Sequence, residues 1–191
     1  MQNVLLVHGY NGIPKIYEWL KKELDKKGYS VIVPEFPSQE GVQYDMWKTI
    51  LNDYKNFINE ETIIVAHSIG NEFIIKYLTE NNLKVDLYIG LAGFADVFEH
   101  AGKEDLNRAV KEFLVNRNEI NSFSKLTNKR LAIYSDNDHI VPFEVLEQYP
   151  KTISAKPFLI KGIGHMGKKS GLETMPEVLE IIYKNNINME I

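Results

Sequence analysis

The sequence predicts a single α/β domain, residues 1–191, built on a doubly wound parallel sheet of about six strands. Short apolar runs rich in Val and Ile alternate with longer amphipathic stretches along the whole chain. The runs are almost unbroken in their apolar character, which is typical of strands buried on both faces. A strand followed by a helix, repeated along the chain, indicates parallel strands joined by right-handed crossovers.

The predicted strands follow one another at intervals that leave room for a helix between them. In chain order they are residues 4–7, 31–33, 62–66, 87–91, 131–134 and 157–160. Pro34 and Pro37 end the second strand in a loop, because proline cannot donate to a ladder of backbone hydrogen bonds.

The predicted helices carry apolar residues at helical spacing, as Ile16, Leu20 and Leu24 do in the first of them. Pro14 opens that helix and Gly28 follows its end, which are the usual places for these residues. The helices are expected at residues 14–27, 42–58, 69–80, 103–114, 143–149 and 175–184.

One connection is much longer than a crossover requires. Residues 94–128, between the fourth and fifth strands, have roughly twice the usual length and form a candidate lid-like insertion over the carboxyl ends of the strands. Phe94, Val97, Phe98 and Phe113 could form its apolar underside, or the aromatic residues among them could be core contacts of an ordinary crossover helix. The sequence leaves both interpretations open.

Composition excludes several classes of function. The 22 Lys and Arg residues against 26 Asp and Glu give a net charge of -4 without a basic block, so nucleic acid is not expected as a partner. The chain has no cysteine, which excludes disulfides and thiolate metal sites and fits a reducing compartment. The first apolar run is too short for a signal peptide or a membrane span. We therefore expect a cytoplasmic protein that does not enter a membrane.

The segment Ala66-His67-Ser68-Ile69-Gly70 resembles a nucleophile elbow, in which a strand turns sharply into a helix. The turn forces its central residue into a strained conformation, so small residues are needed two positions away on each side. Ala66 and Gly70 fill these positions, although the first is often Gly. Ser68 is therefore the candidate nucleophile, and the alternative is that it only caps the following helix.

An acid and a base follow later strands. Asp138 follows the fifth strand and His165 the sixth, so the order is Ser, Asp, His, as expected for α/β-hydrolases. A neutral imidazole can accept the proton of a serine hydroxyl, and a carboxylate on its other nitrogen orients it. Asp136 competes with Asp138 for the second role, but it lies closer to the strand end.

The turn after the first strand, His8 to Gly12, can present the backbone N–H of Tyr10 toward Ser68. Together with the N–H of Ile69, it would form an oxyanion hole. Four side chains beyond the strand ends, together with Tyr10, are predicted to line an acyl pocket: Phe36, Phe94, Phe98 and Met166.

The remaining histidines are expected to be structural or solvated. His8 and His67 are predicted to hydrogen-bond loops around the site, and His139 to be solvated. The histidines lack the spacing of common zinc motifs, and Gly9 and Gly12 lack the rest of a phosphate loop. We expect neither a metal nor another cofactor.

Taken together, these motifs make the chain similar to α/β-hydrolases, in particular to the small serine hydrolases of the retinoblastoma-binding-protein type. The residues that carry the resemblance are Leu5-Leu6-Val7-His8-Gly9, Trp19, Ala66-His67-Ser68-Ile69-Gly70, Ser135-Asp136-Asn137-Asp138, Val141-Pro142 and Gly162-Ile163-Gly164-His165. The resemblance implies a compact core, a small lid, a catalytic triad at Ser68, Asp138 and His165, and hydrolysis of small esters or amides.

The expected activity is that of a carboxylesterase acting on small acyl esters through an acyl-enzyme. A thioesterase, a lactonase or an aminopeptidase would use the same residues. A different class is also open: a hydrolase-fold binding or interaction protein that does not turn over substrate, although no sequence feature indicates a protein partner. A flavodoxin-like nucleotide binder lacks the phosphate motif that it would need.

Overall fold

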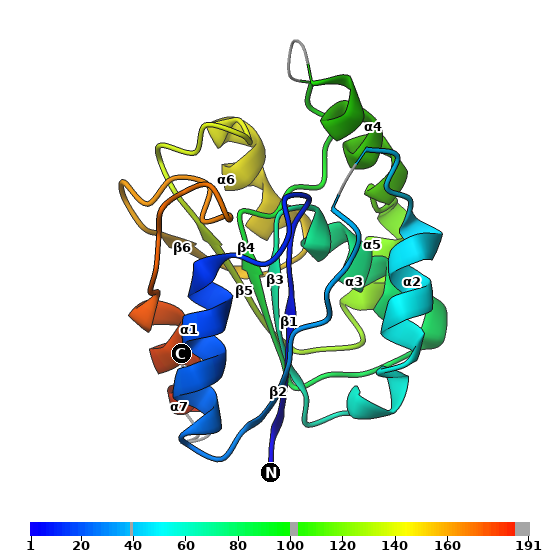
Figure 1. Ribbon diagram of the computed structural model, residues 1–191. Coiled ribbons are helices and arrows are strands. Elements are labelled where there is room, and N and C mark those ends of the chain that lie inside the picture. The colour runs from blue at the N-terminus through cyan, green and yellow to red at the C-terminus, as the bar shows by residue number, and fades with distance from the viewer. Residues whose placement is uncertain (39, 100–102, 186–191) are drawn as a thin grey trace.

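The computed structural model describes residues 1–38, 40–99 and 103–185 of the chain and contains a six-stranded parallel sheet (Figure 1). The strand order is β2-β1-β3-β4-β5-β6. The strands are β1 (Asn3–Val7), β2 (Ser30–Ile32), β3 (Ile63–His67), β4 (Leu87–Leu91), β5 (Lys129–Tyr134) and β6 (Lys156–Leu159). The predicted fold class is confirmed, and the predicted strand bounds agree with these to within two residues.

Helices cover both faces of the sheet. They are α1 (Lys15–Asp25), α2 (Tyr44–Asn52), α3 (Ile69–Asn81), α4 (Glu104–Phe113), α5 (Arg117–Phe123), α6 (Phe143–Thr152) and α7 (Pro176–Asn185), with a 3-10 turn η1 (Lys55–Phe57). Helices α1 and α7 lie together on one face, whereas α2, α3 and α5 lie on the other (Figure 1). Within the described residues, no helix combines the length and apolarity needed to cross a bilayer.

Two helices differ from their predictions. The predicted helix 42–58 ends at Asn52, because Asn52 and Asp53 favour turns over helix interiors, and the chain continues as η1. Helix α5, inside the long connection 94–128, was not expected. Its start carries a capping box in which the Asn116 side chain accepts from the Glu119 backbone N–H and the Glu119 carboxylate accepts from the Asn116 N–H.

The long connection packs against the core over its described residues, which exclude 100–102, as the interpretation of an ordinary crossover helix predicts. Helix α4 turns Ala109, Val110 and Phe113 into the core, and both α4 and α5 pack against α3. The first turn of α4 instead lines the cavity described below. The connection is therefore a packed crossover whose leading end forms a pocket wall.

Strand β6 departs from the expected burial on both faces. Phe158 and Leu159 remain 40% and 42% exposed, whereas the residues of β3 and β4 are fully enclosed. The reason is position, since β6 is the last strand in the sheet and pairs only with β5 among the described strands. Pro157 and Lys156 occupy this edge, where both residue types oppose pairing with another chain.

The strand order reverses between β1 and β3, since β1 leads outward to β2 and all later strands add on the other side. Ligands of open α/β sheets bind at the carboxyl ends of the strands at such a switch point. The residues after β1 are His8 to Gly12, and the residue after β3 is Ser68. The fold thus brings the two earliest sequence motifs together.

Candidate active site

Ser68 lies between β3 and α3 with φ 53° and ψ -131°, a strained conformation for a residue with a side chain. The turn leaves no room at Gly70, because a Cβ there would lie 2.5 Å from the carbonyl oxygen of His8. These are the features of a nucleophile elbow, and they place the Ser68 side chain at the carboxyl end of the sheet.

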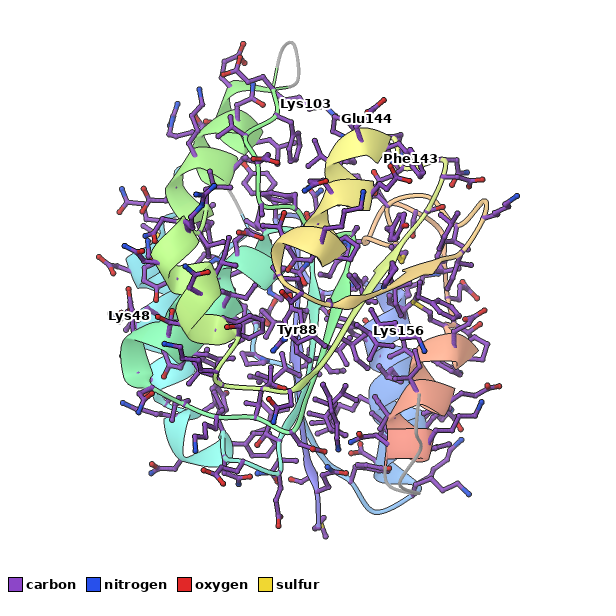
Figure 2. All side chains as sticks on the ribbon, turned by 180° about the vertical axis from the view of Figure 1, so that it is seen from behind. Lys48, Tyr88, Lys103, Phe143, Glu144 and Lys156 are labelled. Atoms are coloured by element: carbon purple, nitrogen blue, oxygen red, sulfur yellow. The ribbon has the colours of Figure 1, made fainter. Side chains whose placement is uncertain are left out.

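The neighbouring strand braces the strained turn. The Ser68 N–H donates to the Leu91 carbonyl oxygen at 2.9 Å, and the Asn71 side chain donates to the carbonyls of Ser68 and Leu91 at 2.8 and 3.1 Å. The hydroxyl of Tyr88, an interior side chain labelled in Figure 2, donates to Asn71 Oδ1 at 2.6 Å. Asn71 was not identified from the sequence as a residue that supports this turn. A polar residue in the first turn of an otherwise apolar helix was a signal that could have indicated it.

His165 and Asp138 complete a hydrogen-bonded chain with Ser68. His165 Nε2 lies 3.2 Å from Ser68 Oγ, and His165 Nδ1 lies 2.8 Å from Asp138 Oδ2. The two side chains are only 8% and 1% exposed. The other carboxylate oxygen, Asp138 Oδ1, accepts the N–H groups of Ile140 and Val141 at 2.7 and 2.9 Å. The three side chains are thus hydrogen-bonded to one another, and the Asp138 carboxylate behind the imidazole is buried.

The surroundings of Asp138 favour its charged form. Burial by itself raises the pKa of this carboxyl group, but the hydrogen bond and charge of His165 and the two backbone N–H groups outweigh burial, so its pKa is lowered. Asp136, the competing residue, instead accepts the Gly162 N–H at 2.8 Å. It is Asp138, and not Asp136, that contacts the imidazole.

The loop after β1 closes on the elbow. The Gly12 N–H donates to the Gly9 carbonyl at 3.2 Å and forms a tight turn around Tyr10. A Cβ at Gly9 would lie 2.9 Å from Ser68 Cβ, so this backbone approaches Ser68 more closely than a residue with a side chain would allow. Ile69 is the first residue of α3, where a backbone N–H has no acceptor within the helix. Both predicted oxyanion donors therefore belong to segments beside Ser68.

A family model described as serine hydrolase matches residues 4–184. The chain belongs to this family. The YdeN protein of Bacillus subtilis (strain 168), whose name describes it as a hydrolase, is 25% identical over 185 residues, covering 95% of this chain and 94% of that relative. The resemblance to α/β-hydrolases noted in the sequence is thereby confirmed.

Solved structures share the fold of this serine hydrolase. The crystal structure of the B. subtilis YdeN gene product superposes with a TM-score of 0.84 at 23% identity, covering 98% of this chain and all of that one. A carboxylesterase structure from the thaumarchaeon Nitrososphaera gargenis has a TM-score of 0.74 at 14% identity, with coverage of 98% and 92%. At these identities the likeness concerns the fold.

The hydrolase encloses two neutral histidines around the elbow. His8 accepts the Phe36 N–H on Nε2 at 2.9 Å and contacts the Gly9 carbonyl through Nδ1 at 2.7 Å, and burial lowers its pKa. His67 contacts the His165 carbonyl oxygen through Nε2 at 2.7 Å, and burial, followed by the charge of His165, lowers its pKa to about 3. Both hydrogen-bond loops of the site, as predicted. Among the described residues, no three His, Asp or Glu side chains are grouped as metal ligands.

Ser68 and His165 open into a cavity of about 400 Å³. Its charged side chains are Glu104 and Asp105 on α4 and three lysines, and Leu106 and Ile140 supply the aliphatic side chains among the described lining residues. Figure 2 labels Lys103 at the start of α4 and Phe143 at the start of α6, at the same end of the molecule. The lining consists of residues 10–12, 67–68, 103–106, 139–140 and 167–170 together with His165.

This lining differs from the predicted acyl pocket. Tyr10 lies in it, but Phe36, Phe94, Phe98 and Met166 do not. Phe36 is 2% exposed and stacks on Trp47 at 4.7 Å, and Phe94 is fully buried against Phe98 at 4.9 Å. Met166 follows His165 but is fully buried. A large apolar side chain contributes more free energy when it is buried in the core than when it lines a water-filled pocket. The prediction that these four residues line the pocket is therefore wrong.

The charged lining was missed in the sequence. Lys168 and Lys169 follow His165 by only three and four positions. The other charged lining residues lie at the start of α4, inside the connection that was predicted to be an insertion over the strand ends. Residues that follow parallel strands converge at one edge of the sheet, and this rule identified Asp138 and His165. The same rule could have identified the two lysines. His139 also lines the cavity, with its ring centroid 6.4 Å from that of His165.

Proposed function

We propose that this serine hydrolase is a carboxylesterase that cleaves small acyl esters through Ser68, His165 and Asp138. One observation carries the proposal: the continuous hydrogen-bonded chain from Ser68 Oγ through the His165 imidazole to the Asp138 carboxylate, with Ser68 in the strained turn of the elbow. A structural N-cap would need neither an imidazole within 3.2 Å nor a buried carboxylate behind it.

The proposed reaction has two halves. Ser68 Oγ attacks the ester carbonyl while its proton passes to His165 Nε2, and collapse of the tetrahedral intermediate expels the alcohol, which takes that proton. Water then attacks the acyl-enzyme, gives its proton to the same nitrogen, and the acid leaves as the proton returns to Ser68 Oγ. Asp138 keeps the imidazole in the required tautomer and stabilises its charged form.

The negative oxygen of each intermediate would be held by the backbone N–H groups of Tyr10 and Ile69. The N-terminus of α3 adds a favourable dipole at this position. By analogy with oxyanion donors in other serine enzymes, each N–H would contribute roughly 2.7–4 kcal/mol to transition-state stabilisation.

The cavity favours short and polar acyl groups, since charged side chains surround Ser68 and aliphatic ones are few. The carboxylesterase among the structural relatives is consistent with ester hydrolysis. A cytoplasmic location is proposed with it, because a chain without cysteine fits a reducing compartment.

The test is labelling with a fluorophosphonate, which reacts with activated serines. We expect one adduct, mapped to Ser68, and hydrolysis of 4-nitrophenyl acetate that falls by about 10⁴-fold or more in Ser68→Ala. A folded parent protein that neither labels nor hydrolyses this ester would contradict the proposal and favour the binding protein without turnover. Labelling that persists in Ser68→Ala would contradict the assignment of the nucleophile.

A further inference from the structure

The ring of His67 lies between the two loops that complete the candidate active site. On one side its Nε2 is 2.7 Å from the carbonyl oxygen of His165, and the two imidazole centroids are 4.8 Å apart. A Cβ at Gly167 would lie 3.1 Å from His67 Cε1, and a Cβ at Gly9 would lie 2.8 Å from His67 Nδ1. Glycines on both sides thus leave only the space that this ring occupies.

The contact with His165 defines the tautomer of His67. A carbonyl oxygen can only accept, so His67 Nε2 carries the hydrogen and donates it. His67 Nδ1 then has only a lone pair, and among the described residues it has no hydrogen-bond partner. The side chain is only 3% exposed, and its lowered pKa keeps the ring neutral; Nε2 carries its hydrogen in this tautomer and in the charged form alike, so the N–H is present throughout the pH range in which a serine hydrolase works.

The loop that receives this hydrogen bond needs support from outside. Gly164 and Met166, on either side of His165, both have positive φ, 63° and 56°. This conformation is strained for Met166, which has a side chain, and such strain persists only where surrounding contacts maintain it. The His67 N–H reaches the one peptide group that joins His165 to Met166.

We propose that His67 is a positioning residue for the catalytic base. Its N–H holds the backbone of His165, while the adjacent residue in the chain, Ser68, carries the nucleophile. A single short stretch of backbone at the end of β3 would then determine the 3.2 Å separation between Ser68 Oγ and His165 Nε2. This role rests on the proposed function, since it concerns the same base.

The experiment must separate this role from simple filling of space. His67→Gln retains an N–H donor at similar reach, whereas His67→Met has comparable volume without a donor. We expect the Met variant to lose about 10- to 100-fold in kcat with little change in KM, as a misplacement near 1 Å would cause. The Gln variant should stay within a few-fold of the parent. A packing role predicts equal losses in both variants, or none, and either result would overturn the proposal.

A second measurement does not depend on turnover. The His165 Nδ1–H, hydrogen-bonded to Asp138, should give a low-field proton resonance that persists in the parent and in His67→Gln and broadens or disappears in His67→Met. An unchanged resonance in a folded Met variant counts against the proposal even if the parent proves inactive, so failure of the function and failure of the positioning role are distinguishable. Should His67→Met not fold, His67→Asn, whose shorter amide cannot reach the carbonyl, replaces it with the same expected loss.

Discussion

Asp138 illustrates how one side chain can satisfy several demands at once. Each carboxylate oxygen has its own partners: the imidazole of His165 on one, and the N–H groups of Ile140 and Val141 on the other. The backbone pair orients the carboxylate toward the imidazole. Burial raises the pKa of Asp138, but the hydrogen bond and charge of His165, with a smaller contribution from the two backbone N–H groups, outweigh burial and lower that pKa. The orientation of the carboxylate therefore comes from the loop after β5, and its charge is favoured mainly by His165.

Replacing Asp138 by Asn tests its role behind the imidazole. Asp138→Asn keeps the shape, but with its single amide oxygen on the Ile140 and Val141 N–H groups its NH₂ faces His165 Nδ1 and favours the wrong tautomer. We expect kcat to fall by about 10⁴-fold, as in other serine hydrolytic triads. Asp136→Asn is the matched control, because Asp136 follows the same strand but contacts Gly162. It should retain activity within a few-fold. Steady-state hydrolysis of 4-nitrophenyl acetate by both variants measures the difference, and similar losses in the two would contradict our assignment.

Helix α3 connects the elbow to the long connection through a buried acid. Glu72, one turn after Ser68, is fully buried, and its Oε2 accepts the Val115 N–H at 3.3 Å, while its Oε1 has no partner among the described residues. Burial raises the pKa of Glu72 well above its usual range, and the opposing effect of the Val115 N–H is smaller. The carboxyl group is thus protonated in the folded protein over a pH range in which it is ionised in the unfolded chain.

This acid should make stability depend on pH. Between its unfolded pKa near 4.5 and its raised folded pKa, the folded state binds one more proton at Glu72 than the unfolded state does, so stability falls as pH rises. Glu72→Gln keeps an acceptor for Val115 but does not titrate. Between pH 5 and pH 8, the parent should lose stability relative to the variant. We expect the difference between their free energies of unfolding, variant minus parent, to increase by up to about 1.4 kcal/mol per pH unit.

Urea unfolding of both proteins at several pH values measures this difference. The comparison uses the change with pH and not the absolute stabilities, because the Gln amide also introduces a buried donor whose cost does not vary with pH. A parent–variant difference that stays constant from pH 5 to pH 8 would show that Glu72 ionises normally in the folded protein.

The assembled fold decides which substrates can reach Ser68. The cavity joins segments from five separate parts of the chain, and the aromatic side chains expected to line it are packed in the core. What remains beside Ser68 is a space of about 400 Å³ with lysines and carboxylates on its walls. Among its described lining residues, only Leu106 and Ile140 offer aliphatic side chains to a long acyl chain.

Acyl-chain preference tests this view of the cavity. For 4-nitrophenyl esters below their critical micelle concentration, we expect kcat/KM to be highest for acetate to butyrate and at least about 10-fold lower for dodecanoate, since each added CH₂ would gain far less than the ~0.8 kcal/mol of full burial. A rise in kcat/KM with chain length would instead indicate an apolar channel. Steady-state kinetics on the ester series provides the measurement.

Much of this molecule could be predicted because its signals are local. The alternation of apolar runs with amphipathic stretches predicted the parallel sheet, and the positions after the strands brought Ser68, Asp138 and His165 to one edge. Rules about strand ends need no knowledge of side-chain packing. Helix α5 and the end of α2 were missed or misplaced although each has a local signal, the capping box of Asn116 and Glu119 and the turn-favouring pair Asn52 and Asp53, because such short signals are weak next to the apolar periodicity around them.

The sequence by itself determined the fold class, the strand-to-helix turn at Ser68 and the places of Ser68, Asp138 and His165 after successive strands, because each depends on periodicity or on a short motif. Only the tertiary structure showed that Asp138, and not Asp136, contacts His165, and that β6 lies at an edge of the sheet. It also placed Phe36 and Phe94 in the core, and Lys168 and the start of α4 beside the cavity. These outcomes depend on distances between segments far apart in the chain, where competition among side chains for buried space selects the arrangement and no local pattern records the result.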